Sequence, residues 1–215
     1  MANAPQSHRA RALVWDLPVR VSHWLLAVTV SIAWLTGEFE TLRLIHAASG
    51  GAALGIAFFR ILWGLVGSSP ARFTAFIRPP HEAVAYLRAL AAALLSGQTA
   101  PHYTSHNPAG GYAVVALLLL AVITPLTGWL TFNDWGGKWL EESHEALANL
   151  FLLAIAVHLI GVTVGSIAHR ESLPRAMVTG IKQVAHAEEG ISSPRRWGVV
   201  PLAIAALVGA WWAIQ

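Results

Sequence analysis

The stretch that decides the fold is residues 142–168, ESHEALANLFLLAIAVHLIGVTVGSIA. It is longer than the ~20 mostly apolar residues that a transmembrane helix needs, yet it carries His144 and His158. At 1.5 Å per residue, their separation in a helix is about 21 Å, most of the ~30 Å hydrocarbon core. Fourteen steps of about 100° leave both side chains within ~40° of one face. One helix therefore presents two imidazoles to the same side, one near each membrane surface.

Four other stretches are similarly apolar: residues 17–36, 42–66, 109–132 and 198–214. The whole chain is 55% hydrophobic and only 12% charged, whereas soluble domains carry about 25% charged residues. We therefore expect an all-α integral membrane protein, a four-helix transmembrane bundle with a fifth, C-terminal transmembrane helix. The long connection after the second stretch contains a helical pattern over residues 81–95. We interpret it as a helix lying on the inner leaflet, with a loosely ordered loop as the alternative.

The basic residues predict the orientation. With the N-terminus in the cytoplasm, twelve Lys and Arg lie inside: Arg9, Arg11, Arg20, Arg60, Arg72, Arg78, Arg88, Arg170, Arg175, Lys182, Arg195 and Arg196. Only Arg43 and Lys138 then lie outside. By the positive-inside rule this asymmetry places the N-terminus of a multi-pass membrane protein in the cytoplasm. The excess of basic over acidic residues therefore indicates membrane topology, and we expect no nucleic-acid partner.

Four of the ten histidines lie in the apolar stretches, where ionisable residues usually face the bundle interior and indicate a functional site. With this orientation, His46 and His144 lie near the outer surface, and His23 and His158 near the inner one. Because imidazole is a common axial ligand of haem iron, the matched depths predict two bis-histidine haem sites. The alternatives are helix–helix hydrogen bonds and, more weakly, zinc, whose tetrahedron could not include both His144 and His158. The chain has no Cys, which excludes thioether-linked haem and iron–sulfur clusters.

Three further residues are candidates for contact with a cofactor. Arg20 lies just below His23, and Arg60 follows His46 by about 21 Å of helix, so both could pair with carboxylates of the inner haem. They could equally be ordinary inner-side topology charges. Asn107, with its neighbour His106, stands at the inner end of the third stretch, where a quinone carbonyl could be bound. The other histidines are expected to be solvated surface residues: His8, His81, His102, His169 and His186.

The segment 15–24, WDLPVRVSHW, together with His46 and the His144/His158 pair, resembles the bacterial cytochrome b561 family, which includes the cytochrome b subunits of nickel–iron hydrogenases. The segments SHNP at 105–108, SHEA at 143–146 and HRE at 169–171 are also similar to family patterns. The resemblance covers about residues 14–182. It implies a multi-pass protein of the bacterial inner membrane, with two non-covalent haems b held by His23, His46, His144 and His158 and a quinone site on the inner side. We expect residues 1–182 to form the di-haem domain, and residues 183–215 an inner linker and the additional helix.

The favoured function is electron transfer between a periplasmic partner, a cytochrome c or a hydrogenase-like subunit, and membrane quinone. The missing Cys supports a partner, since any iron–sulfur or haem c centre must belong to another polypeptide. A second hypothesis is a stand-alone quinone-linked oxidoreductase that acts on a small oxidant or reductant such as superoxide. A third is a non-redox transporter or assembly factor with structural histidines. We assign no catalytic residue, and an electron-transfer subunit is favoured over a complete enzyme.

Overall fold

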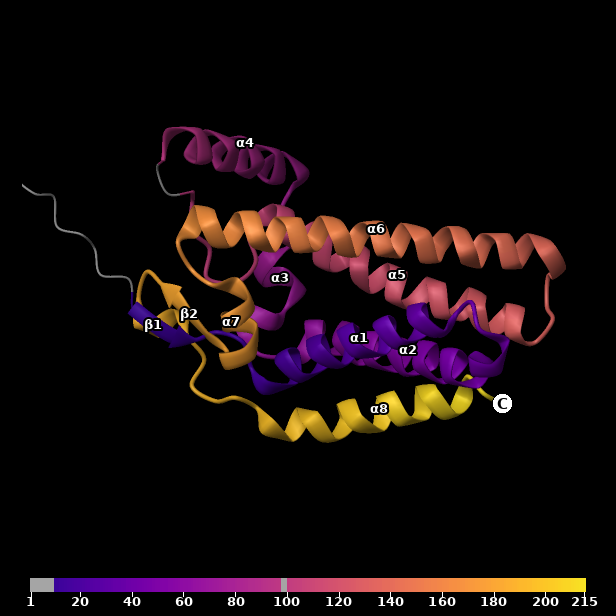
Figure 1. Cartoon of the computed structure of the whole chain (residues 1–215). Coiled ribbons are helices and arrows are strands. Elements are labelled where there is room, and N and C mark those ends of the chain that lie inside the picture. The colour runs from indigo at the N-terminus through magenta and orange to yellow at the C-terminus, as the bar shows by residue number, and fades with distance from the viewer. Residues whose placement is uncertain (1–9, 98–99) are drawn as a thin grey trace, which may run out of the picture.

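The computed structural model describes residues 10–97 and 100–215. Within them, four helices are long and apolar enough to cross a membrane. They are α1 (Leu17–Thr36), α2 (Arg43–Val66), α5 (Pro108–Phe132) and α6 (Gly137–His169). They run side by side along the long axis of the molecule, and α8 (Val199–Trp212) lies against them (Figure 1). The four-helix bundle with a fifth, shorter apolar helix is confirmed.

Local signals explain where the helices begin and end. The side chain of Asp16 accepts a hydrogen bond from the Val19 amide at 2.9 Å and caps α1, and Asn107 does the same for α5 through the Gly110 amide at 2.7 Å. A proline in the first turn follows each cap. The helix α6 begins five residues before the expected residue 142, because it also includes residues 137–141, GKWLE, which precede the continuous apolar stretch.

One end of the bundle carries the remaining structure, and we call it the inner end, following the charge distribution. It holds α3 (Phe73–Phe76), α4 (Pro80–Ser96), α7 (Leu173–Thr179) and the short 3-10 helices Ser69–Ala71, Ala187–Glu189 and Arg196–Gly198. The helix expected over 81–95 is therefore present as α4, while its position on a leaflet stays a prediction. The other, outer end carries the α1–α2 and α5–α6 connections, including the 3-10 helix Glu40–Leu42 (Figure 1).

The inner end also contains a small sheet that the sequence did not predict. Strand β1 (Ala10–Leu13) pairs antiparallel with β2 (Ile181–Val184), so that Ala10 faces Val184. The sheet ties the chain before α1 to the chain after α7. The domain boundary that we placed between residues 182 and 183 falls inside β2 and stays a prediction.

A buried polar contact holds the inner ends of α1 and α2 together. The Asp16 carboxylate accepts hydrogen bonds from the Trp63 indole at 3.0 Å and from the Ser68 hydroxyl at 2.5 Å. Around it lies an apolar core to which α8 contributes Leu202. Large apolar side chains on the outward faces of the helices are exposed, as expected when lipid is the solvent.

Candidate functional site

At the outer end, the rings of His46 on α2 and His144 on α6 face each other. Their centroids are 6.1 Å apart and their planes are nearly perpendicular. The Nδ1 atom of His46 lies 2.8 Å from the Ala33 carbonyl oxygen of α1. The Nδ1 atom of His144 lies 3.0 Å from the Thr124 carbonyl oxygen of α5. The four long helices thus all contribute to this pair.

These two carbonyl contacts determine which ring nitrogen is available. A carbonyl oxygen only accepts, so Nδ1 of each ring must carry the hydrogen and donate it. Each Nε2 then keeps its lone pair. Metal-ligating histidines commonly donate the other N–H to a backbone carbonyl in this way, which orients the ring and raises its basicity. Both outer imidazoles therefore leave Nε2 available to coordinate a metal ion.

At the inner end, His23 on α1 and His158 on α6 form the second pair. Their centroids are 6.4 Å apart, with the planes inclined by 54°. The Nδ1 atom of His23 is buried without a hydrogen-bond partner among the described residues. The pairs expected from depth in the membrane are thus the pairs that the fold brings together.

The spacing of the pairs fits an ion held between two imidazoles. A metal–imidazole bond is about 2.0–2.1 Å and the ring centre lies about 1.2 Å behind the nitrogen, so two ligands on opposite sides of one ion have centroids about 6.4 Å apart. Within residues 10–97 and 100–215, no three His, Cys, Asp or Glu side chains converge on a possible metal position. A tetrahedral zinc site is therefore unsupported, whereas each pair could hold one ion between its two imidazoles.

The outer pair lines a partly open pocket between the helices. Its cavity volume is about 110 Å³. Gly50 and Gly128 are on its wall. At Gly128 a Cβ atom would lie 2.7 Å from Cε1 of His144. A glycine is required there because the imidazole occupies the space of its side chain.

Residues 14–180 match the prokaryotic cytochrome b561 family. The chain belongs to that family. It is similar to a probable Ni/Fe-hydrogenase B-type cytochrome subunit of Rhodobacter capsulatus, with 24% identity over 80% of this chain and 81% of the relative. A subunit of the same description from Azotobacter vinelandii is 25% identical over 67% of this chain and 70% of its own length. No solved structure gives a significant match.

Membership makes the chain a multi-pass membrane b-type cytochrome, a haem b protein of electron transport. Two arginines at the inner end have side-chain nitrogens without a hydrogen-bond partner among the described residues. Arg60 is buried, its Nη1 atom has no partner among the described residues, and it lies within electrostatic range of His23. Arg20 donates from Nη1 to the Val178 carbonyl at 2.6 Å, while its buried Nε also lacks a partner there. Both guanidinium groups thus retain donors for an anionic ligand.

In this b561-family cytochrome, His106 and Asn107 have different surroundings. The His106 ring packs on Trp15 and Phe76, with centroids 4.7 and 4.8 Å away. Burial, reinforced by the charge of Lys182, lowers the pKa of His106 from 6.5 to about 3, so the ring is neutral at pH 7. Its Nδ1 has no partner among the described residues. Asn107 uses its Oδ1 to cap α5, which leaves only its amide N–H groups for a ligand.

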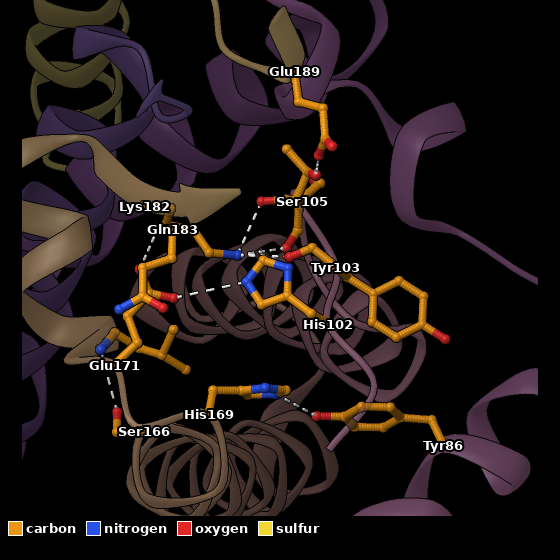
Figure 2. Close-up of polar contacts among 12 residues, drawn as sticks. Tyr86, His102, Tyr103, Ser105, Ser166, His169, Glu171, Lys182, Gln183 and Glu189 are labelled. Carbon is orange, nitrogen blue, oxygen red and sulfur yellow. Dashed lines mark hydrogen bonds and ion pairs between the residues drawn. The ribbon is translucent and has the colours of Figure 1, made fainter. Parts of the chain in front are cut away.

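The loop that carries these two residues is clamped by a buried polar cluster (Figure 2). The Lys182 ammonium donates to the carbonyls of Tyr103, Thr104 and Ser105 at 2.9, 2.9 and 3.1 Å. Because consecutive carbonyls are held by one charged group, the path of the chain into α5 is fixed. None of these Lys182 contacts was predicted from the sequence.

The same cluster corrects the expectation of solvated side chains for His102 and His169, whereas His81 and His186 are exposed as expected. His169 is 8% exposed and its Nε2 lies 3.2 Å from the Tyr86 hydroxyl of α4. The His102 ring is 4.0 Å from a Glu171 carboxylate oxygen, and both side chains are largely buried (Figure 2). Burial raises the pKa of Tyr86 to about 12, so its hydroxyl stays protonated. His8 lies outside the described residues.

Proposed function

We propose that this cytochrome binds two haems b, one between His46 and His144 and the other between His23 and His158. The two histidine pairs, at centroid distances of 6.1 and 6.4 Å, carry this proposal. When bound, each haem iron gains and loses one electron. Two sites along one bundle, separated by about 21 Å of α6, provide a route for electrons from one membrane surface to the other.

The residues of the chain hold and orient the two groups. The carbonyls of Ala33 and Thr124 fix the outer imidazoles, and Arg20 and Arg60 offer donors for carboxylates at the inner site. The apolar helices exclude water from the path between the sites, which limits proton leakage and side reactions. Asn107 and His106 line the region where we place quinone.

We further propose that a redox protein outside the membrane exchanges electrons with the outer site, and membrane quinone with the inner site. The relatives described as hydrogenase cytochrome subunits support a hydrogenase-type partner. The excess of inner-side Lys and Arg supports a cytoplasmic N-terminus in the bacterial inner membrane. A water-soluble cytochrome c is the alternative partner.

The test is haem quantification of protein purified in mild detergent, by pyridine haemochrome analysis. We expect two haems b per chain in the wild type and one in each of the variants His46→Ala, His144→Ala, His23→Ala and His158→Ala. The His46 and His144 variants should lose the same spectral component, and the His23 and His158 variants the other. Stoichiometry of one or less in the folded wild type, or a shared loss between His23 and His144, would overturn the proposal.

A further inference from the structure

Trp129, one turn before the outer end of α5, has a donor without an acceptor. Its indole Nε1 is buried and makes no hydrogen bond with any described residue. The side chain is on the wall of the pocket that contains His46 and His144. Buried N–H groups are nearly always satisfied, so this donor indicates an acceptor that occupies the pocket.

The orientation of Trp129 depends on the C-terminal helix. Its ring stacks on Trp212 of α8, with centroids 4.5 Å apart and planes inclined by 24°. The Trp135 ring also packs on it, with centroids 5.9 Å apart and planes inclined by 56°. Because the indole contacts two other rings and makes no hydrogen bond with any described residue, packing sets the direction of its N–H group.

The helix α8 is docked closely enough to serve as a wall of the outer pocket. A Cβ atom added at Gly51 of α2 would lie 2.2 Å from the Gly209 carbonyl oxygen, and one at Gly55 would lie 2.0 Å from that of Ala205. Backbone therefore contacts backbone along the two helices. This contact brings Ala213, just past the end of α8, onto the pocket wall beside the histidines.

We propose that α8 is a part of the outer haem site, in which the Trp129 indole donates a hydrogen bond to a haem carboxylate and Trp212 holds the indole in place. The inference rests on the proposed function for the existence of that haem. The carboxylates of a haem b are its polar edge, and Trp129 lies near the outer end of α5, where that edge would reach the membrane surface. Trp129 is thus a ligand-contacting residue, and Trp212 is a positioning residue.

The hydrogen bond has an electrostatic consequence. An N–H group that donates to a carboxylate draws its negative charge away from the iron, which favours the reduced state. Loss of the N–H should therefore lower the reduction potential of the outer haem and weaken its retention, while the inner haem is unaffected. Partners of this kind change affinity by roughly 10–100-fold when removed.

The experiment compares four variants of the full-length protein in detergent: Trp129→Phe, Trp212→Leu, Trp212→Phe and Trp211→Leu. The first removes the N–H and keeps an aromatic ring, the second removes the stacking ring, and the third keeps a stacking ring. The fourth is the matched control, since Trp211 is 62% exposed. Redox titration monitored by visible spectra reports each haem potential, and transfer of haem to apomyoglobin reports retention.

We expect Trp129→Phe to lower the outer potential and to accelerate outer-haem loss about tenfold. Trp212→Leu should act in the same direction, and Trp212→Phe and Trp211→Leu should resemble the wild type. Unchanged outer potential and retention in Trp129→Phe would overturn the hydrogen bond, and an effect of Trp129→Phe without one of Trp212→Leu would overturn the role of α8. A wild type that lacks the outer haem would instead reject the proposed function.

Discussion

Replacement of Gly128 by alanine should damage the outer site alone. The added Cβ would lie 2.7 Å from Cε1 of His144, 3.1 Å from Nδ1 and 3.3 Å from Nε2. Carbon atoms in favourable contact are about 3.5–4.0 Å apart, so the ring would have to retreat by about 1 Å. A flexible side chain could do this at low cost, but this ring is anchored.

The hydrogen bond that anchors the His144 ring determines how much haem affinity the substitution should cost. The Nδ1 of His144 is 3.0 Å from the Thr124 carbonyl oxygen, and a displacement of about 1 Å would lengthen that contact beyond the range of a hydrogen bond. The lost bond is worth about 1 kcal/mol, and the displaced Nε2 no longer points along the metal bond. We therefore expect outer-haem affinity to fall by roughly 10–100-fold, which is ~1.4–2.8 kcal/mol.

The matched control is Gly161→Ala in α6, because a Cβ at Gly161 meets no atom within 4 Å. Haem stoichiometry and the two-component redox titration are measured for both variants and for the wild type. Gly128→Ala should lose or weaken only the component that the His144→Ala variant removes. Full loading with unchanged potentials in Gly128→Ala would refute the reasoning that the His144 ring is held rigidly beside this glycine.

Three other outcomes are expected. Asn107→Ser keeps an α5 cap but removes the amide donor, so it should slow haem reoxidation by a water-soluble quinone analogue. Asn107→Ala should slow it too, and should also lower the melting temperature because about 1 kcal/mol of helix capping is lost. Equal reoxidation rates in the wild type and both variants would exclude a role of this amide. Because the pKa of His106 falls from 6.5 to about 3 on folding, the unfolded chain binds the extra proton, and stability should drop as the pH falls from about 6.5 towards 3, by at most ~1.4 kcal/mol per pH unit. A His106→Phe variant, studied by thermal unfolding in detergent, should show a flatter pH profile in that window. Lys182→Met should leave three carbonyls without their donor and cost about 2–4 kcal/mol, with faster hydrogen exchange over residues 103–107 as the local readout.

The membrane helices were predictable because hydropathy and length determine them almost alone. The beginnings of α1 and α5 carried side-chain caps, and their predicted bounds agree with the structure to within a residue. The helix α6 starts five residues early because its first residues, 137–141, include Lys138 and Glu141 and precede the continuous apolar stretch. The sheet was not predictable, since β1 and β2 are four residues each and their partners are distant in sequence.

The proximity of the histidine pairs followed from depth, but their surroundings did not. The anchors of His46 and His144 are backbone carbonyls, which have no signature in side-chain sequence. His102 and His169 were assigned to solvent because they lie outside the apolar stretches, whereas the packing of α4 and the chain around β2 buries them. The HRE segment at 169–171 was the local signal that could have indicated otherwise, since Glu171 accepts from the Gln183 amide at 2.6 Å.

The different anchoring of the two pairs also predicts the direction of electron flow. Both outer imidazoles donate Nδ1–H to carbonyls, which makes them more basic ligands and favours oxidised iron. No such carbonyl bond is found for His23 or His158 in the described residues, and the buried charge of Arg60 lies within range of His23 and favours the reduced state. The outer haem should therefore have the lower reduction potential, so that electrons pass from an outer donor to the inner site.

A redox titration, with each component assigned through the His144→Ala and His158→Ala variants, measures the order of the two potentials. Arg60→Gln should lower the inner potential towards the outer one. An outer haem of higher potential would contradict this reasoning and would favour flow from quinone to an external acceptor.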